Sequence, residues 1–258
     1  MVTEINLNAD MGEGHGVYDI GDDESLLKII RSANVACRFH AGDPTVMHRL
    51  VLRARDEGVS IGAHPGFNDL SGFGRRRIDM RPEELEHSIS YQIGALQAMA
   101  AYANLKVTHV KPHGALNNMA AENRELADAI GRAIKTVDPA IIYVALAGSE
   151  MQKSGEALGL TVACEGFADR QYDDDGNLTS RKIEGSVIRD PEVARDRVVK
   201  MVREQAVTSR GGKKIPLRID SICVHGDEPT AVAVARAVRD GLEAAGVTIV
   251  PLPEMKLG

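Results

Sequence analysis

Short apolar runs alternate along this chain with longer stretches in which apolar residues recur at helical spacing. Apolar runs of this kind between turn residues are typical of strands that are buried on both faces. Helices between such strands predict parallel pairing, because each helix returns the chain to the same edge of the sheet. The predicted strands cover residues 5–9, 35–39, 59–63, 107–110, 141–145, 160–164 and 219–224, with helices over 23–32, 44–57 and 82–102. The pattern predicts an α/β protein with a parallel sheet, either a barrel or an open sheet.

Proline marks the start of several predicted helices. Pro44, Pro82 and Pro191 each stand at a first helical position, where the missing N–H costs no hydrogen bond. Asp43 has the position of an N-cap. No strand run is followed by GxGxxG, and GxxxxGK[ST] is absent from the sequence, so neither a Rossmann fold nor a P-loop is supported.

Two long irregular segments interrupt the alternation, over residues 64–80 and 166–186. Loops of this length in a compact domain are usually functional. In the second segment, the sequence Asp-Asp-Asp-Gly-Asn at 173–177 predicts a small hairpin. The sequence Gly-Gly-Lys-Lys at 211–214 is expected to form a flexible surface loop.

The composition is that of an ordinary globular protein, with 43% hydrophobic and 26% charged residues. One domain over residues 1–258 suffices to bury a core, because barrels of about 250 residues are common. The net charge of −6, without a basic block longer than Arg75-Arg76-Arg77, argues against nucleic acid or an anionic membrane as a partner. The first residues do not resemble a secretory signal peptide, and no apolar run is long enough to span a membrane, so we expect a cytoplasmic protein. Small molecules or proteins are the expected partners.

The cysteines are Cys37, Cys164 and Cys223. They are odd in number, far apart in sequence and placed inside apolar runs, so a disulfide framework is not expected. Buried free thiols are the expected state.

Reactive side chains follow the predicted strands. In parallel α/β folds the active site lies at the carboxyl ends of the strands, because every strand delivers its loop to that face. A single His or Asp there is usually a helix cap or a satisfied polar residue, but six strand ends carry such residues. They are Asn8, Asp10, Glu13, His40, Asp43, His64, Lys111, His113, Glu165, Asp169, Arg170, His225 and Asp227. The convergence predicts an active site.

Three of these residues have the composition of a divalent metal site. Asp10, His40 and His64 offer a carboxylate and two imidazoles on successive strands. Their spacing is no compact signature, so a site that uses the same residues for proton transfer alone fits the sequence equally well. Lys111 and His113 share one side of a strand end, where Lys would polarise a carbonyl or hold an anion and His would shuttle protons.

The two long segments also carry arginines, which bind carboxylate or phosphate through paired N–H donors. We expect some of them to clamp an anionic substrate and others to be solvated. They are Arg75, Arg76, Arg170 and Arg181.

Seven ordered stretches of the chain resemble the LamB/YcsF family, the A component of 5-oxoprolinase. The stretches are residues 6–14 (NLNADMGEG), 32–44 (SANVACRFHAGDP), 61–66 (IGAHPG), 72–76 (GFGRR), 110–116 (VKPHGAL), 165–172 (EGFADRQY) and 224–227 (VHGD). Each is short, but seven in order over nearly the whole chain make chance agreement implausible.

The resemblance implies a distorted seven-stranded β/α barrel similar to the glycoside hydrolase/deacetylase superfamily, with the open doubly wound sheet as second choice. It further implies cleavage of 5-oxo-L-proline to L-glutamate, coupled to ATP hydrolysis and carried out together with subunits B and C. ATP would phosphorylate the lactam oxygen first, because a five-membered lactam is a poor electrophile.

The implied catalytic residues are Asp10, Glu13, His64, Lys111 and His113. The first three would activate water, and the last two would stabilise developing negative charge. Substrate binding would fall to a second set, in which an arginine holds the substrate carboxylate. That set is His40, Arg76, Glu165, Asp169, Arg170, His225 and Asp227.

Two positions depart from the family pattern. Arg38 stands where the pattern has Gly, and Gly there would allow an unusual backbone angle or the close approach of a ligand. The Arg38 side chain is compatible with an outward position, with an added anion contact or with an impaired site. Asn117 stands where Tyr is more usual, which changes little.

Two other functions are compatible with the sequence. A stand-alone metal-dependent amidohydrolase or deacetylase would use Asp10, His40 and His64 for its metal and would need no ATP. A non-catalytic lactam- or sugar-binding subunit would bind without turnover. The alanine-rich stretch 94–103 is compatible with a homo-oligomer and equally with packing on the barrel.

Overall fold

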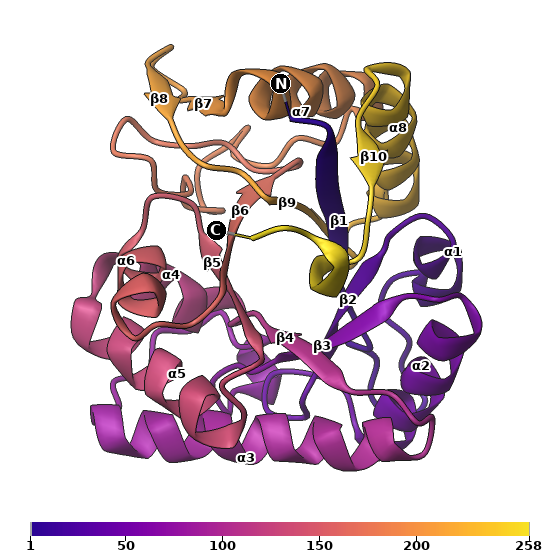
Figure 1. The fold of residues 1–258 in the computed structure, drawn as a ribbon, viewed down its shortest axis with the longest axis vertical. Coiled ribbons are helices and arrows are strands. Elements are labelled where there is room, and N and C mark those ends of the chain that lie inside the picture. The colour runs from indigo at the N-terminus through magenta and orange to yellow at the C-terminus, as the bar shows by residue number, and fades with distance from the viewer. Residues whose placement is uncertain (1, 258) are drawn as a thin grey trace.

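The computed structural model describes residues 2–257, which form a closed parallel barrel surrounded by helices (Figure 1). Within these residues the barrel strands are β1 (Glu4–Met11), β2 (Ser32–Ala36), β3 (Ser60–His64), β4 (Val107–Val110), β5 (Ile142–Leu146), β6 (Val162–Phe167) and β9 (Ser221–His225). Neighbouring strands pair in parallel, and β1 closes the ring on β9 through register pairs such as Asn8↔Cys223. The predicted seven-stranded β/α barrel is therefore confirmed, and the open sheet is excluded.

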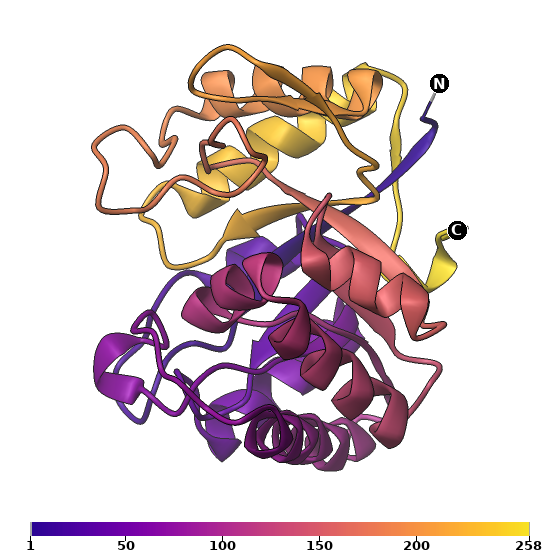
Figure 2. The same ribbon diagram turned by 90° about the vertical axis from the view of Figure 1, so that its left-hand side faces the viewer.

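Helices cover the outside of the barrel (Figures 1 and 2). In the described part of the chain they are α1 (Asp23–Leu27), α2 (Pro44–Asp56), α3 (Pro82–Ala101), α4 (Gly114–Glu122), α5 (Arg124–Val137), α6 (Glu150–Ala157), α7 (Pro191–Glu204) and α8 (Ala231–Ala244). The two views show α7 and α8 side by side, and α3 lies against α5. None of the helices in residues 2–257 is long and apolar enough to cross a membrane.

The predicted helix starts are present. Asp43 caps α2 by accepting hydrogen bonds from the N–H groups of Thr45 and Val46, directly before Pro44. Asp190 caps α7 in the same way. These side chains satisfy N–H groups that have no partner inside the helix.

The first helix and the second strand differ from the prediction. The helix predicted over residues 23–32 ends at Leu27, because the N–H of Arg31 already bonds to the carbonyl of Leu7 and the chain has joined the sheet. The strand predicted over 35–39 occupies Ser32–Ala36 instead. The prediction relied on apolar residues and therefore missed the start of this strand. Ser32 and Asn34 are strand residues whose polar side chains point into the barrel.

The barrel interior is polar rather than apolar. Along β1, the apolar residues that alternate with Asn6 and Asn8 belong to the core that the helices cover. Asn8 on β1 donates to Glu165 on β6, 2.9 Å away, although β9 separates these two strands in the sheet. Asn34 donates to Asn8 across the same interior at 2.7 Å. Buried amides are stable here because other interior side chains satisfy them.

The C-terminal segment covers the barrel at the amino ends of the strands, where it is drawn in yellow (Figure 1). Strand β10 (Thr248–Ile249) pairs with β1, and the 3₁₀ helix η2 (Leu252–Glu254) follows. Leu252 is fully buried and packs with Ile142, Val144 and Ala163, the first apolar layer of β5 and β6. Its N–H donates to Ser32 Oγ at 3.1 Å. The segment therefore acts as an apolar plug.

Both predicted irregular segments carry local structure. The first contains the 3₁₀ helix η1 (Leu70–Gly72), and the second makes the predicted hairpin through the antiparallel bridge Tyr172↔Leu178. Residues 211–214 are exposed, as predicted, but they form the turn and first residue of a hairpin between β7 (Ala206–Thr208) and β8 (Lys214–Pro216).

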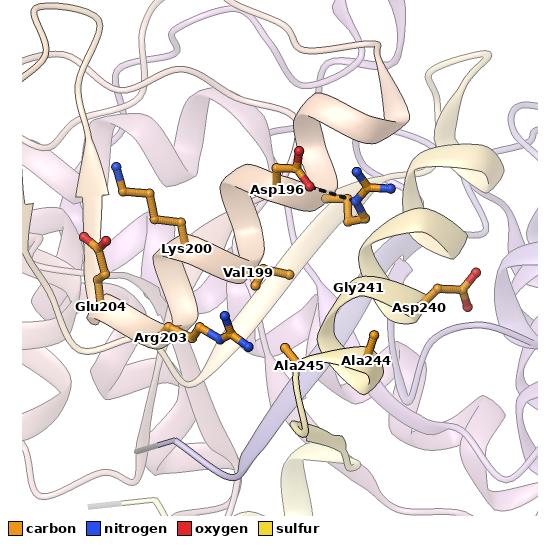
Figure 3. Close-up of a pocket in the computed structure, with 10 residues that line it drawn as sticks. Asp196, Val199, Lys200, Arg203, Glu204, Asp240, Gly241, Ala244 and Ala245 are labelled. Atoms are coloured by element: carbon orange, nitrogen blue, oxygen red, sulfur yellow. Dashed lines mark hydrogen bonds and ion pairs between the residues drawn. The ribbon is translucent and has the colours of Figure 1, made fainter.

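A groove of about 700 Å³ lies between α7 and α8 (Figure 3). Its lining includes Arg195, Lys200, Arg203 and Asp240. The groove is on the outer helical surface, away from the carboxyl ends of the strands, and Arg195 is already paired with Asp196 at 2.8 Å. It therefore takes no part in the strand-end chemistry.

Replacing Leu252 by alanine should lower the free energy of unfolding by about 2–5 kcal/mol, because the truncated plug leaves a cavity against β5 and β6. Chemical denaturation followed by circular dichroism measures this loss. Leu70→Ala is the matched control, since Leu70 is 38% exposed and should cost under about 0.5 kcal/mol. Equal losses in the two variants would contradict the role of the plug.

Candidate functional site

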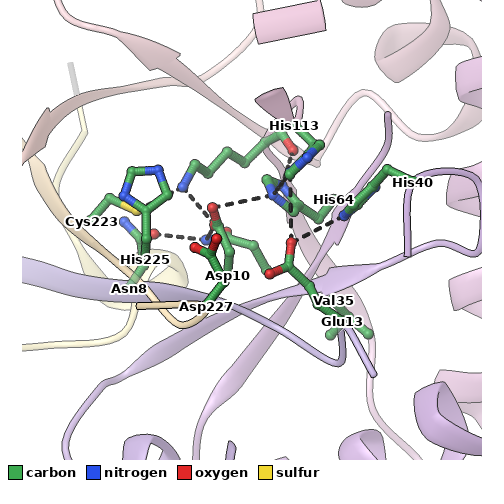
Figure 4. Close-up of polar contacts among 12 residues, drawn as sticks. Asn8, Asp10, Glu13, Val35, His40, His64, His113, Cys223, His225 and Asp227 are labelled. Carbon is green, nitrogen blue, oxygen red and sulfur yellow. Dashed lines mark hydrogen bonds and ion pairs between the residues drawn. The ribbon is translucent and has the colours of Figure 1, made fainter. Parts of the chain in front are cut away.

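The structure gathers the predicted strand-end residues at one end of the barrel (Figure 4). Side chains from β1, β3, β4, β6 and β9 meet there because parallel strands share one carboxyl edge. The residues of this mouth that are buried are Asp10, Glu13, His40, His64, Lys111, His113, Glu165, Asp169 and Arg170. His225 and Asp227 lie beside them at the end of β9 and in the loop that follows.

A buried ion cluster occupies the centre of the mouth. Lys111 Nζ lies 2.7 Å from Asp10 Oδ1, 2.8 Å from Cys223 Sγ and 3.4 Å from Glu165 Oε1. Burial alone would raise the pKa of Asp10, but the His64 imidazole and the Lys111 ammonium hold it well below its usual range. Asp10 is therefore ionised at neutral pH.

The other two members of this cluster also have shifted acidities. Burial alone would lower the pKa of Lys111, but Asp10, Cys223 and Glu165 raise it well above its usual value. Burial raises the pKa of Glu165 to about 7, against the opposing effect of Lys111. The ammonium donates hydrogen bonds to Asp10 and Cys223, and Glu165 lies at ion-pair distance. Lys111 is thus placed to stabilise the ionised form of Asp10.

Beside this cluster, Glu13, His40, His64 and His113 bring four metal-ligating atoms within 4.8 Å of one another. His40 Nε2 is 3.2 Å from Glu13 Oε1, and His113 Nδ1 is 3.6 Å from the same oxygen. His64 Nε2 lies 3.1 Å from His113 Nδ1. We call these four residues the Glu-His cluster. They could hold a metal ion.

The metal set expected from the sequence is only partly reproduced. His40 and His64 belong to the Glu-His cluster, whereas Asp10 lies next to it, with Oδ2 3.3 Å from His64 Nε2. Glu13 and His113, which the resemblance implied as catalytic residues, also belong to the Glu-His cluster. Burial raises the pKa of Glu13 well above its usual range, with Asp10 adding to the effect. Burial also lowers the pKa of His40 and of His113.

A second acid–base pair lies on the other side of Asp10. His225 Nδ1 is 2.8 Å from Asp169 Oδ2. Burial alone would raise the pKa of Asp169, but His225 lowers it, so the carboxylate is ionised and orients the ring. Asp227 does not join this pair, because it accepts a hydrogen bond from Arg75 at 2.7 Å.

The two candidate carboxylate anchors differ in placement. Arg76 is 66% exposed at its side chain and pairs with Asp69. Arg170 is buried and donates from Nη2 to the carbonyl of Thr179, while its Nε has no hydrogen-bond partner within residues 2–257. Burial, with Arg181 nearby, lowers the pKa of Arg170 to about 10. Arg170 is therefore the better placed of the two to receive a buried anion.

Sequence reasoning missed several residues that support the site from inside the barrel. Asn34 Nδ2 donates to Asp10 at 2.9 Å, and His109 Nε2 lies 3.1 Å from Asn34 Oδ1. Burial lowers the pKa of His109 to about 3, so this ring is neutral. The signal that could have found them is a polar residue in the middle of an apolar run.

Comparison with known proteins relates this arrangement to one family. The sequence matches the LamB/YcsF family over residues 5–257. The chain belongs to the LamB/YcsF family. It is 54% identical to the 5-oxoprolinase A subunit of Rhodopseudomonas palustris strain BisB5, over 96% of this chain and 98% of that protein. It is 52% identical to the 5-oxoprolinase A subunit of Natranaerobius thermophilus, over 95% of each.

Solved structures agree with this membership. The lactam utilization protein of Thermus thermophilus superposes with a TM-score of 0.91 at 43% identity, covering 97% of this chain and all of the other. The catalytic domain of a peptidoglycan N-acetylglucosamine deacetylase from Eubacterium rectale superposes with a TM-score of 0.51 at 13% identity, covering 97% of this chain and 88% of the other. That second likeness concerns the fold alone and connects this LamB/YcsF chain to deacetylase-like barrels.

Arg38, the departure from the LamB/YcsF pattern, has the backbone angle that the expected glycine would favour. Its φ is +77°, in the left-handed region. Its side chain is exposed, whereas Cys37 and His40 on either side are buried. Of the three outcomes left open by the sequence, the outward position is observed. Cys37, Cys164 and Cys223 are buried and free, as expected.

Arg38→Gly should raise the free energy of unfolding by about 0.5–1 kcal/mol, because the left-handed strain of roughly 1–2 kcal/mol exceeds the entropy that glycine adds to the unfolded chain. Thermal and urea unfolding measure the change. Arg77→Gly, at an exposed position without a positive φ, should instead lower stability slightly. A loss of stability in Arg38→Gly would show that no strain is stored there.

Lys111→Met should destabilise the fold by about 3–5 kcal/mol, because it leaves Asp10 and Glu165 as buried carboxylates without their cation. Adding Asp10→Asn should recover part of the loss, which gives a coupling energy of about 1–3 kcal/mol in a double-mutant cycle followed by urea unfolding. The exposed pair Arg124–Asp128 is the control, and its coupling should stay below about 1 kcal/mol. If the unfolding free-energy changes of Asp10→Asn and Lys111→Met simply added in the double variant, the two residues would not depend on each other.

Proposed function

We propose that this chain opens the lactam ring of 5-oxo-L-proline to give L-glutamate, as the A component of an ATP-coupled 5-oxoprolinase that works with subunits B and C. The observation that carries the proposal is membership of the LamB/YcsF family over residues 5–257, with 5-oxoprolinase A subunits as relatives at about half identity. The buried acid–base groups of the mouth support it, because lactam hydrolysis requires a base for water and a proton for the leaving nitrogen.

Asp10 is the proposed base. It is ionised, its charge is fixed by Lys111, and its second oxygen lies beside His64. A proton taken from water can therefore pass to the carboxylate or be shared with the imidazole. Asn34 holds the other carboxylate oxygen, so that the group keeps one orientation.

The Asp169–His225 pair is the proposed source of the proton for the ring nitrogen. Asp169 fixes Nδ1 of His225 and stabilises the positive charge of a protonated ring. His225 is 12% exposed at its side chain, which makes its other nitrogen accessible from the mouth. Arg170, with its free Nε, is the proposed partner of the substrate carboxylate.

ATP enters the proposal as co-substrate of the assembled enzyme. Transfer of the γ-phosphoryl group to the lactam oxygen turns a poor electrophile into a good one. Water then adds at that carbon, the C–N bond breaks as nitrogen takes a proton, and a second water releases phosphate. The sequence has neither a P-loop nor a GxGxxG motif, so we assign the phosphoryl transfer to the partner subunits.

One observation favours a second candidate, a stand-alone metal-dependent amidohydrolase or deacetylase. The Glu-His cluster offers metal-ligating atoms without any need for a nucleotide. Turnover of 5-oxoproline or of an acetylated amide by the chain alone, without ATP, would favour this candidate.

Glutamate formation and phosphate release from 5-oxoproline and ATP should occur only when this chain is mixed with subunits B and C. Asp10→Asn should lower kcat by about 10²–10⁴, because the base is removed. Asp56→Asn, at an exposed carboxylate, should leave kcat unchanged. A complete absence of turnover, with partners proven active beside a different A component, would overturn the proposal.

A further inference from the structure

The two imidazoles at the centre of the Glu-His cluster face each other in an arrangement that neutral rings do not tolerate. His64 Nδ1 lies 2.7 Å from the carbonyl oxygen of Lys111, and His113 Nε2 lies 2.7 Å from that of Phe73. A carbonyl oxygen only accepts, so both of these nitrogens carry hydrogen. The remaining nitrogens, His64 Nε2 and His113 Nδ1, then present lone pairs to each other across 3.1 Å. A positive charge must lie between them.

The Glu13 carboxylate supplies a third ligand atom beside the two imidazole nitrogens. Its Oε1 is 3.6 Å from His113 Nδ1, and the carboxylate is only 3% exposed. In a tetrahedral site with bonds of 2.0–2.1 Å, neighbouring ligand atoms are roughly 3.4 Å apart. The observed separations of 3.1 and 3.6 Å fall on either side of that value. A proton shared by the two imidazoles would bridge only His64 and His113, whereas a metal cation can be bound by both nitrogens and by the Glu13 carboxylate at once.

His40 has a different position. Its ring is stacked flat on His113, with 3.7 Å between the centroids and 6° between the planes. Two stacked rings cannot both aim an in-plane lone pair at one point. His40 Nε2 is instead 3.2 Å from Glu13 Oε1, where an N–H donates to the carboxylate and orients it. Such an outer hydrogen bond is typical of carboxylate ligands, as are the two carbonyl contacts of His64 and His113 for imidazole ligands.

We infer that Glu13, His64 and His113 bind a divalent transition metal ion, with Zn²⁺ the best match to two imidazoles and a carboxylate, and that His40 positions Glu13. Three protein ligands leave one tetrahedral position open. Asp10 lies next to that centre, 3.3 Å from His64 Nε2, and stays paired with Lys111. The site stands on this geometry and does not rest on the proposed reaction.

Metal analysis of the untagged full-length chain tests the inference. Purified without chelator, the wild type should contain about one zinc or similar ion per chain, and after chelation it should bind one Zn²⁺ in calorimetry. Glu13→Gln, His64→Asn and His113→Asn should each raise the Kd at least 100-fold. His40→Gln should raise it by about 10–100-fold, as expected for a positioning residue. His225→Asn, a mouth histidine outside the cluster, should bind as the wild type does.

The outcomes separate the competing states. If the wild type binds no divalent metal, the inference is wrong. Wild-type affinity in a folded His113→Asn or Glu13→Gln variant would also overturn it. Where circular dichroism shows that a variant does not fold, the visible spectrum of the Co²⁺-loaded wild type replaces it as the test. The strong absorption of four-coordinate Co²⁺ would support the tetrahedral site, and the weak absorption of six-coordinate Co²⁺ would contradict it.

Discussion

The contact between the Lys111 ammonium and the Asp10 carboxylate organises the interior of this barrel. Both groups are almost completely buried, and each stabilises the charge of the other: Lys111, together with His64, lowers the pKa of Asp10, and Asp10 raises the pKa of Lys111. Glu165 and Cys223 share the same ammonium, and Asn34 shares the carboxylate. The pair therefore links β1, β2, β4, β6 and β9 through one charge. A barrel lined with apolar side chains would be held by packing alone and would offer no ionised base at its mouth.

The polar interior explains why the two ends of the barrel differ. Amide, hydroxyl and carboxylate groups fill the middle and the mouth, where substrate and ions would enter, and they satisfy one another. The opposite end has an apolar layer on β5 and β6, and Leu252 covers it. Burial of apolar surface is favourable without specific polar partners. The C-terminal segment can therefore close that end of the barrel by apolar packing. Reactive groups are thus confined to one end.

Much of this could be predicted from the sequence, and the exceptions have one cause. Parallel strands deliver their loops to one edge, so the convergence of Asp10, His64 and Lys111 followed from strand order alone. The shift of β2 to Ser32–Ala36 was not predictable from hydrophobicity, because its inward residues are polar. Sequence spacing carries no distances, so it could not show that Glu13 and His113, rather than Asp10, join His40 and His64 in the Glu-His cluster. Arg38 is the opposite case: the family glycine left open an unusual backbone angle or the close approach of a ligand, and the structure shows the unusual angle, with φ of +77°.

Both long segments form ion pairs with the residues directly after His225. Arg75 of the first segment pairs with Asp227, and Arg181 of the second pairs with the adjacent Glu228. Arg189 reaches the same Glu228 carboxylate. Any displacement of residues 227–228 must therefore loosen both segments at once.

These same residues lie only two and three positions beyond His225, whose ring Asp169 orients. Access to the mouth and the placement of the proposed proton donor consequently depend on one short stretch of chain. A carboxylate that competed for Arg75 or Arg181 would weaken these ion pairs, because each arginine is already paired with a carboxylate of residues 227–228.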